Sequence, residues 1–307
     1  MSKLFVFALL FLSCSNAFGS QVYSEYKKLD IDKLKKNHQV KELSTFNIYT
    51  NRIESYKGFD FKEILRRLYG PHWDKTFAYA IMCDNGYESH IETYKFVERM
   101  PLLAFARADQ KNFSSILDVR SKIMKLGPLH LVWKETYKKK TKEYAAPRRH
   151  HWPIGVVGIR QIKLLPLQLL PKEPSKTNIW GMKNYFKQCI HCHKLNGIGG
   201  KLSVNLSKNQ EWKKKGKKWL YRYIDNPVSI NPKAKMDPFP IKIDLRTKRI
   251  NDIISYLYDM TSEQVLSEKA KKLNTSKKSS QKENISSGQK RKARSKELQE
   301  LLDRNRL

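Results

Sequence analysis

Two cysteines separated by two residues and followed directly by a histidine form the pattern in this chain with the most specific chemistry. They are Cys189, Cys192 and His193, in the stretch Cys-Ile-His-Cys-His. Thiols at this spacing can each form a thioether with a vinyl group of haem, and the histidine that follows can ligate the iron. The pattern therefore predicts covalent attachment of one haem c, with His193 as an axial ligand of the iron.

Two other kinds of site share part of this pattern. A zinc site needs a second pair of ligands at matching spacing, and no cysteine follows Cys192. A thioredoxin-like redox pair needs a helix after its cysteines, whereas the helical pattern here precedes them. Haem attachment is therefore the interpretation that we retain.

The iron needs a second axial ligand, and a thioether sulfur is the one that we expect. Met236 is the candidate, in the stretch Pro232-Lys-Ala-Lys-Met-Asp-Pro238. Met182 and Met260 are competitors, but both fall on helical patterns. Methionine ligation raises the haem potential and favours acceptance of an electron.

Helical patterns lie on both sides of the motif. Gly181, Tyr185 and Cys189 recur at every fourth position, so they share one face of a helix. The stretch 219–225 predicts a helix that stops before proline, and 248–258 predicts a last helix with an Ile/Leu stripe.

With these features, residues 177–261 resemble class I cytochromes c. The resemblance implies an all-α domain in which Gly181 lets the last helix cross closely and Tyr185 packs at the crossing. In that family a proline after the motif supplies the carbonyl that orients the axial histidine, and Val204 takes its place here. We expect the Val204 carbonyl to accept a hydrogen bond from His193 instead.

The first residues, 1–19, predict a signal peptide. Lys3 precedes the apolar run 4–12, which is too short to span a bilayer. We favour cleavage after Ala17 or Gly19, and the alternative is a lipoprotein signal in which lipidated Cys14 anchors the chain to the membrane. Both place the mature chain in the periplasm or cell envelope, where c-type haem is attached.

Residues 23–163 predict an α+β domain with mixed sheets. Residues 23–42 are charged and polar, and we expect a poorly ordered or surface lead-in. A helix is predicted from the N-cap Asp60 to Gly70. Short apolar runs predict strands over 46–50, 77–83, 90–96, 101–106, 127–133 and 151–159.

This stretch resembles the oxidoreductase molybdopterin-binding fold of the sulfite oxidase family. The resemblance rests on Tyr56-x-Gly58 before a helix, Asp84-x-Gly86-Tyr87, Gly127-Pro128-x-x-Leu-Val-Trp133 and Trp152-Pro153. In that family a cysteine followed by a basic stretch holds the molybdenum, and no Arg-rich loop follows Cys83. We therefore interpret Cys83 as a small buried hydrophobe, expect no molybdopterin, and assign the domain to partner docking.

Two further segments complete the predicted domain organisation. Residues 164–176 are proline-rich and predict a semi-rigid linker between the domains. Residues 262–307 are rich in Lys and Ser, and we expect a basic disordered tail.

The chain is strongly basic, with 61 Lys and Arg against 29 Asp and Glu and a formal net charge of +32. Such an excess favours anionic partners. Because no nucleic-acid-binding motif is present, we expect no nucleic-acid partner. A lysine cluster interrupted by Trp212 and Trp219 fits either an acidic redox protein or a solvated loop; its members are Lys208, Lys213, Lys214, Lys215, Lys217 and Lys218.

These features predict an exported monohaem c-type cytochrome that transfers electrons between donor and acceptor proteins. The principal alternative is a two-domain molybdenum oxidoreductase, similar to a sulfite dehydrogenase, or its haem-containing subunit. Whether the chain is itself an enzyme stays open. A haem-based sensor would need an open sixth position on the iron.

Overall fold

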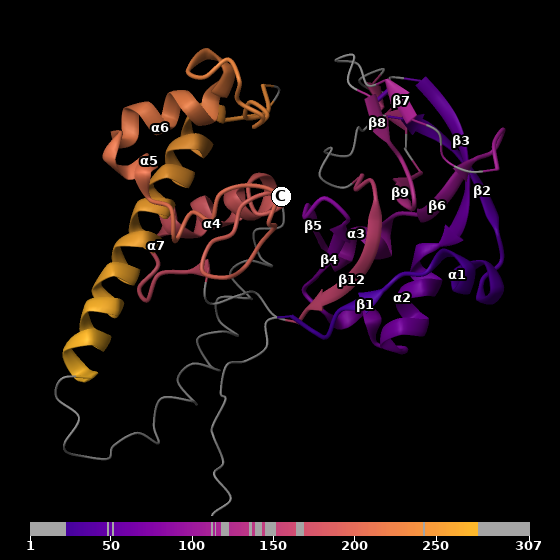
Figure 1. Cartoon of the computed structure of the whole chain (residues 1–307), viewed down its shortest axis with the longest axis horizontal. Coiled ribbons are helices and arrows are strands. Elements are labelled where there is room, and N and C mark those ends of the chain that lie inside the picture. Colours follow the sequence, from indigo (N-terminus) through magenta and orange to yellow (C-terminus); the bar gives the residue numbers. More distant parts are fainter. Residues whose placement is uncertain are drawn as a thin grey trace, which may run out of the picture.

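The structure is a computed structural model of the chain. It describes residues 23–47, 49–50, 52–111, 113, 115–117, 123–134, 137–138, 143–144, 152–163, 169–241 and 243–275, the segment 262–275 as backbone only. The predicted signal peptide, Cys14 and residues 276–307 of the predicted tail lie outside the described residues. Figure 1 shows the strands gathered in one half of the molecule and the helices α4 to α7 in the other.

The first half is an α+β unit. Its strands are β1 (Lys27–Lys28), β2 (Lys41–Asn47), β3 (Arg52–Asp60), β4 (Ala78–Cys83), β5 (Glu88–Glu92), β6 (Pro101–Arg107), β7 (Ser115–Leu117), β8 (Ile123–Lys125), β9 (His130–Trp133), β10 (Tyr137–Lys138), β11 (Glu143–Tyr144) and β12 (Val156–Ile162). Its helices are α1 (Ile31–Asn37), α2 (Phe61–Tyr69), the short 3-10 helix η1 (Trp73–Lys75) and α3 (Thr93–Glu98).

Two four-stranded sheets form the frame of this half. Their strand orders are β1-β12-β4-β5 and β2-β3-β6-β9, with the small pairs β7-β8 and β10-β11 beside them. Every described pairing is antiparallel, so the expectation of mixed sheets is wrong. Consecutive strands β2-β3 and β4-β5 are joined by short connections that permit only antiparallel pairing, and the remaining neighbours pair antiparallel across longer stretches of chain.

Strand β4 is buried on both of its faces. Tyr79 and Ile81 point into the core of the α+β half, whereas Ala78 and Ala80 belong to the core shared with the helices of the other half. Alternate residues of a strand point to opposite faces, so a continuous apolar run is what such a strand requires. The strand predicted over 77–83 is therefore confirmed. Its residues are apolar on both faces because each face packs in a different core.

The second half of the chain is helical. Its helices are α4 (Lys176–Gln188), α5 (Glu211–Lys214), α6 (Gly216–Asp225), the 3-10 helix η4 (Pro227–Ser229) and α7 (Arg246–Thr275). A capping box between Ser175 and Asn178 starts α4, because each side chain satisfies a backbone N–H of the other. Helix α6 ends at Asp225 before Pro227, as the sequence predicts.

Helices α4 and α7 cross closely at Gly181. A Cβ atom added there would lie 2.2 Å from the Asp252 carbonyl oxygen and 2.4 Å from the Cβ of Tyr256. Tyr185, one turn further, is fully buried with its ring 5.8 Å from that of Tyr256. The predicted close crossing at Gly181 and packing at Tyr185 are both confirmed.

Several predicted local structures are wrong. The lead-in 23–42 lies largely at the surface, as expected, but it contains β1, α1 and the start of β2, because Asp30 caps α1 and Leu34 is buried. The strand predicted over 46–50 is the end of β2, which begins earlier at Lys41. The strand predicted over 90–96 stops at Glu92 and turns into α3, whose Phe96 fills the core.

The segments on either side of the helical half also differ from expectation. Leu169 and Leu170, in the predicted linker, are buried, and the hydroxyl of Tyr256 donates to the Leu169 carbonyl at 2.7 Å. This part of the linker is therefore packed against α7. Helix α7 continues through residues 262–275, where the sequence predicts disorder.

Among the described residues, no helix combines the length and apolar character needed to cross a membrane.

Replacing Gly181 with alanine tests the helix crossing. Alanine has the better helix propensity by about 1 kcal/mol, but its Cβ would meet the Asp252 backbone, so we expect a net loss of about 1–3 kcal/mol in the free energy of unfolding. Urea unfolding measures it, with Thr177→Ala on the exposed side of α4 as the control. A Gly181→Ala protein as stable as the wild type would contradict the crossing.

Candidate functional site

The C-x-x-C-H motif follows α4 without a gap. Cys189 is the C-cap of this helix, and its N–H donates to the Tyr185 carbonyl at 2.8 Å. The N–H groups of Cys192 and His193 both donate to the Cys189 carbonyl, at 3.2 and 3.0 Å. The two thiols therefore lie on one turn, and both are free rather than joined in a disulfide.

The His193 ring is oriented by one hydrogen bond. Its Nδ1 lies 3.0 Å from the Val204 carbonyl oxygen. Since a carbonyl only accepts, Nδ1 carries the proton and Nε2 keeps its lone pair. Burial lowers the pKa of His193, which favours this neutral ring. The bond to Val204 is the one expected from the sequence.

The loop after the motif is fitted tightly against it. A Cβ atom on Gly199 would lie 2.2 Å from the His193 carbonyl oxygen, and one on Gly200 would lie 2.0 Å from that of His191. The buried hydroxyl of Tyr185 donates to the same His193 carbonyl at 3.0 Å. These contacts hold the backbone of the motif from two sides.

Met236 lies in the same part of the helical half as the motif. It is half-buried and packs against the apolar core of the helical half, against which Cys189 also packs. Its neighbour Asp237 lies close enough to Cys192 to act on it electrostatically. Burial, and secondly the charge of Asp237, raise the pKa of the Cys192 thiol to about 11. Burial raises the pKa of Cys189 to about 12.

A turn and strand of the α+β half lie against the motif. The Glu88 N–H donates to the His191 carbonyl at 3.1 Å, and the His90 N–H donates to Nδ1 of His191 at 3.1 Å. The ring of Tyr87 stacks on that of His191, with centroids 6.0 Å apart and planes at 27°. The Lys201 N–H donates to the Gly86 carbonyl at 2.9 Å.

These residues were missed in the sequence. No spacing or motif connects Tyr87 with His191, because about a hundred residues separate them and only the tertiary structure brings them together. The turn 84–87 itself carried a signal, since Asp84-x-Gly86-Tyr87 was singled out, but for fold rather than contact with the motif.

A second contact joins the halves through Tyr23. Its hydroxyl lies 3.1 Å from His90 Nε2 and accepts the Gly199 N–H at 3.1 Å. The Arg160 guanidinium stacks 3.5 Å from the Tyr23 ring centroid and binds the buried carboxylate of Glu88 at 2.7 Å. Burial lowers the pKa of His90 to about 3 and raises that of Tyr23 to about 12. Both groups are therefore neutral near pH 7.

Cys83 lies in the core of the α+β half. It is 6% exposed, and burial raises the pKa of its thiol to about 12, so it is protonated.

The buried His130 is a second titratable residue in this half, and its Nδ1 lies 2.9 Å from the Pro153 carbonyl. The Nε2 of His130 and the Nε1 of the neighbouring Trp152 have no hydrogen-bond partner among the described residues. Burial lowers the pKa of His130 to about 4.

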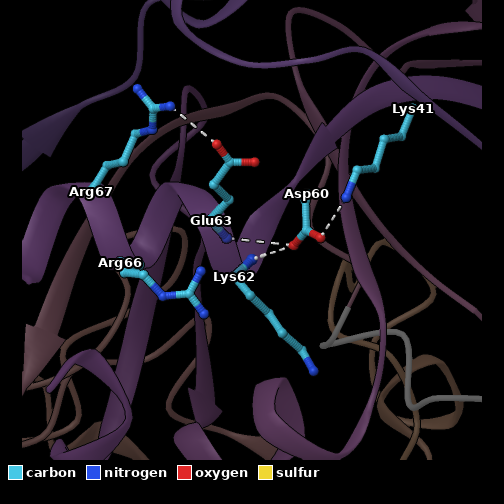
Figure 2. Close-up of a pocket in the computed structure, with 6 residues that line it drawn as sticks. All are labelled: Lys41, Asp60, Lys62, Glu63, Arg66 and Arg67. Atoms are coloured by element: carbon cyan, nitrogen blue, oxygen red, sulfur yellow. Dashed lines mark hydrogen bonds and ion pairs between the residues drawn. The ribbon is translucent and has the colours of Figure 1, made fainter. Parts of the chain in front are cut away.

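We also looked for metal-binding clusters and pockets elsewhere in the described part of the chain. No group of three or more His, Cys, Asp or Glu side chains there is arranged to hold a metal ion. A surface pocket of about 490 Å³ lies at the start of α2, lined by Lys41, Asp60, Lys62, Glu63, Arg66 and Arg67. Figure 2 shows Asp60 accepting from the first turn of α2 and from Lys41, an arrangement that caps the helix.

The chain was compared with models of protein families and with curated proteins. No model of a protein family matches it, and no curated protein matches it by sequence.

The buried His130 predicts a dependence of stability on pH. Its folded pKa is about 4 and the unfolded value about 6.5, so the unfolded state binds the extra proton and stability is lost as pH falls from about 6.5 toward 4. In His130→Asn this contribution disappears, and the slope of unfolding free energy against pH becomes shallower by about 1 kcal/mol per pH unit.

Urea unfolding between pH 4.5 and 6.5 measures these slopes. His72→Asn is the matched control, because His72 is exposed, and it should keep the wild-type slope. An unchanged slope in His130→Asn would show that His130 titrates normally in the folded protein.

Proposed function

We propose that this chain is a c-type cytochrome that is exported and transfers single electrons through one covalently attached haem. The observation that supports this best is the geometry of the motif. Two free thiols on one turn stand beside a histidine whose Nδ1 is bound to the Val204 carbonyl, so its Nε2 is available to an iron ion. A polypeptide that holds haem c needs this combination.

The roles of the proposed site residues follow from their chemistry. Cys189 and Cys192 would form the thioethers, and His193 would ligate the iron through Nε2. Met236 is the proposed second axial ligand, supported by its packing against the same core as Cys189 and by the electrostatic effect of its neighbour Asp237 on Cys192. When bound, the haem supplies a site that accepts and releases one electron, at a potential that methionine ligation raises.

We further propose that the helical half, residues 177–261, is a class I cytochrome c domain. The close crossing of α4 and α7 at Gly181 supports this, together with α6 between them in sequence. The α+β half is proposed as the sulfite oxidase-like fold without molybdopterin. The buried, protonated thiol of Cys83 supports a role in the core for this residue. Stoichiometric molybdenum in purified protein would overturn that part of the proposal.

The proposed partners are redox proteins with acidic surfaces. Lys215 lies over the ring of Trp219 at 4.4 Å, and Lys217 over that of Tyr258 at 5.1 Å, so aromatic rings order part of the lysine cluster. Lys208 and Lys218 are exposed. Exposed positive charges of this kind attract a protein with an acidic surface and raise the rate at which the two proteins associate.

The haem and its ligand are tested by spectroscopy and mass measurement. After denaturation and reduction, mass spectrometry should find the mass of haem still bound to the peptide that contains Cys189 and Cys192. Alkylation should modify Cys83 but neither motif cysteine.

Met236→Ala should keep the haem, because the thioethers remain, but lose the weak long-wavelength absorption band of Met–iron ligation and show a lower midpoint potential.

Met100→Ala is the control for this substitution, because Met100 is 61% exposed in the α+β half. It should leave spectrum and potential unchanged. A chain exported and matured in a host with haem-attachment machinery that carries no haem would refute the proposed function. Haem with an unchanged spectrum in Met236→Ala would refute the ligand.

The partner surface is tested by reversing charge. In Lys208→Glu/Lys218→Glu, we expect the second-order rate of reduction by a strongly acidic reduced flavodoxin to fall about tenfold at low salt. The difference should shrink as ionic strength rises. Lys36→Glu/Lys134→Glu changes the net charge equally on exposed residues of the α+β half, and equal effects of both variants would exclude a local docking surface.

A further inference from the structure

One of the two motif residues without a proposed role in binding the haem, His191, has an unusual environment. His191 is 1% exposed and lies between the two halves of the molecule. Its Nδ1 accepts the His90 N–H, and its Nε2 lies 3.3 Å from the Lys187 carbonyl. Since Nδ1 accepts, the neutral ring carries its proton on Nε2 and can donate it to that carbonyl. Both ring nitrogens are thus engaged, one with each half.

The backbone around His191 is engaged as well. Its carbonyl accepts the Glu88 N–H at 3.1 Å, and the Lys201 N–H donates to the Gly86 carbonyl at 2.9 Å. Strand β5 is the last strand in the order β1-β12-β4-β5, so its outer N–H groups have no further strand to pair with. The motif loop satisfies two of them, which fixes it to the sheet edge.

Apolar packing continues beside these hydrogen bonds. Phe186 of α4 contacts Phe77 and His90, with ring centroids 5.5 and 6.0 Å apart. Ala78 and Ala80 of β4 lie in the same core as α4 and α7. A shared apolar core and backbone pairing hold two domains in one arrangement, unlike a flexible tether.

The turn that carries Tyr87 also reaches the cysteines. Tyr87 stacks on His191, the residue directly before Cys192, so this turn lies next to the second thioether position. The stack of Tyr87 on His191 sets the position of the tyrosine ring.

We propose that the α+β half forms a fixed wall of the haem site, with His191 as the positioning residue that holds the attachment loop against Tyr87 and β5. This inference rests on the proposed function, because it assigns a role toward the attached haem. With haem attached at Cys192, such a wall would limit the access of water to it. Solvent exposure and hydrogen bonding around a haem set its potential, so the wall tunes that potential.

The test compares two substitutions of His191 in the full chain. Asn places an oxygen near the position of Nδ1 and can accept the His90 N–H, whereas Leu cannot. In His191→Leu, we expect amide hydrogen exchange at Glu88 and His90 to accelerate about tenfold or more and the haem midpoint potential to shift. His191→Asn should restore most of both properties.

Tyr87→Leu provides a second variant outside the motif, in case His191→Leu hinders haem attachment. It should shift the potential in the same direction, whereas Tyr94→Leu, on an exposed tyrosine of α3, should not. If amide exchange becomes faster but the haem midpoint potential is unchanged in both His191→Leu and Tyr87→Leu, the proposal that the α+β half forms a wall of the haem site is refuted. Unchanged exchange in His191→Leu overturns the docking role of His191.

The outcomes separate this inference from the proposed function. A wild-type chain without haem refutes the proposed function, and exchange at Glu88 and His90 still reports docking in that protein. A chain with haem whose potential is insensitive to His191→Leu and Tyr87→Leu refutes the wall alone.

Discussion

Burial of strand β4 on both of its faces is the constraint on which the arrangement of the molecule depends. On one side, Tyr79 and Ile81 of β4 fill the core of the α+β half. On the other, Ala78 and Ala80 pack in the core that contains α4 and α7. Small side chains on this face let the helices approach closely, and the area removed from water stabilises the pair of halves. Because Cys189 caps α4, the same packing fixes where the motif lies.

The geometry of the motif depends on backbone carbonyls more than on side chains. The Val204 carbonyl orients His193, the Cys189 carbonyl closes the turn, and the hydroxyl of Tyr185 binds the His193 carbonyl. Gly199 and Gly200 let the following loop approach to contact distance. A valine therefore serves in this position, since every residue has a carbonyl. Rigidity comes from the surrounding packing rather than from a proline ring.

Local patterns predicted the elements whose stabilising contacts lie nearby in sequence. Helix α2 followed from its cap Asp60 and stop Gly70, and β4 from its continuous apolar run. The α4–α7 crossing at Gly181 was expected only from the resemblance of this segment to class I cytochromes c, since the spacing of Gly181 and Tyr185 does not by itself name the partner helix. The antiparallel sheets, α1 and α3 were missed or misjudged. Their signals are short and weak, and Leu34 and Phe96 are fixed by a core that the sequence alone does not display.

The sequence by itself determined the chemistry proposed for this protein, because thioether spacing and an adjacent histidine depend only on local geometry. It also indicated the residue that orients His193, since Val204 lies eleven positions further along the same loop. Only the tertiary structure decided what His191 and Tyr87 do. They are far apart in the chain and meet through the edge of β5, and contacts of this kind arise from the packing of whole elements. The α+β half, which the sequence presented as a separate docking domain, thereby becomes part of the surroundings of the motif.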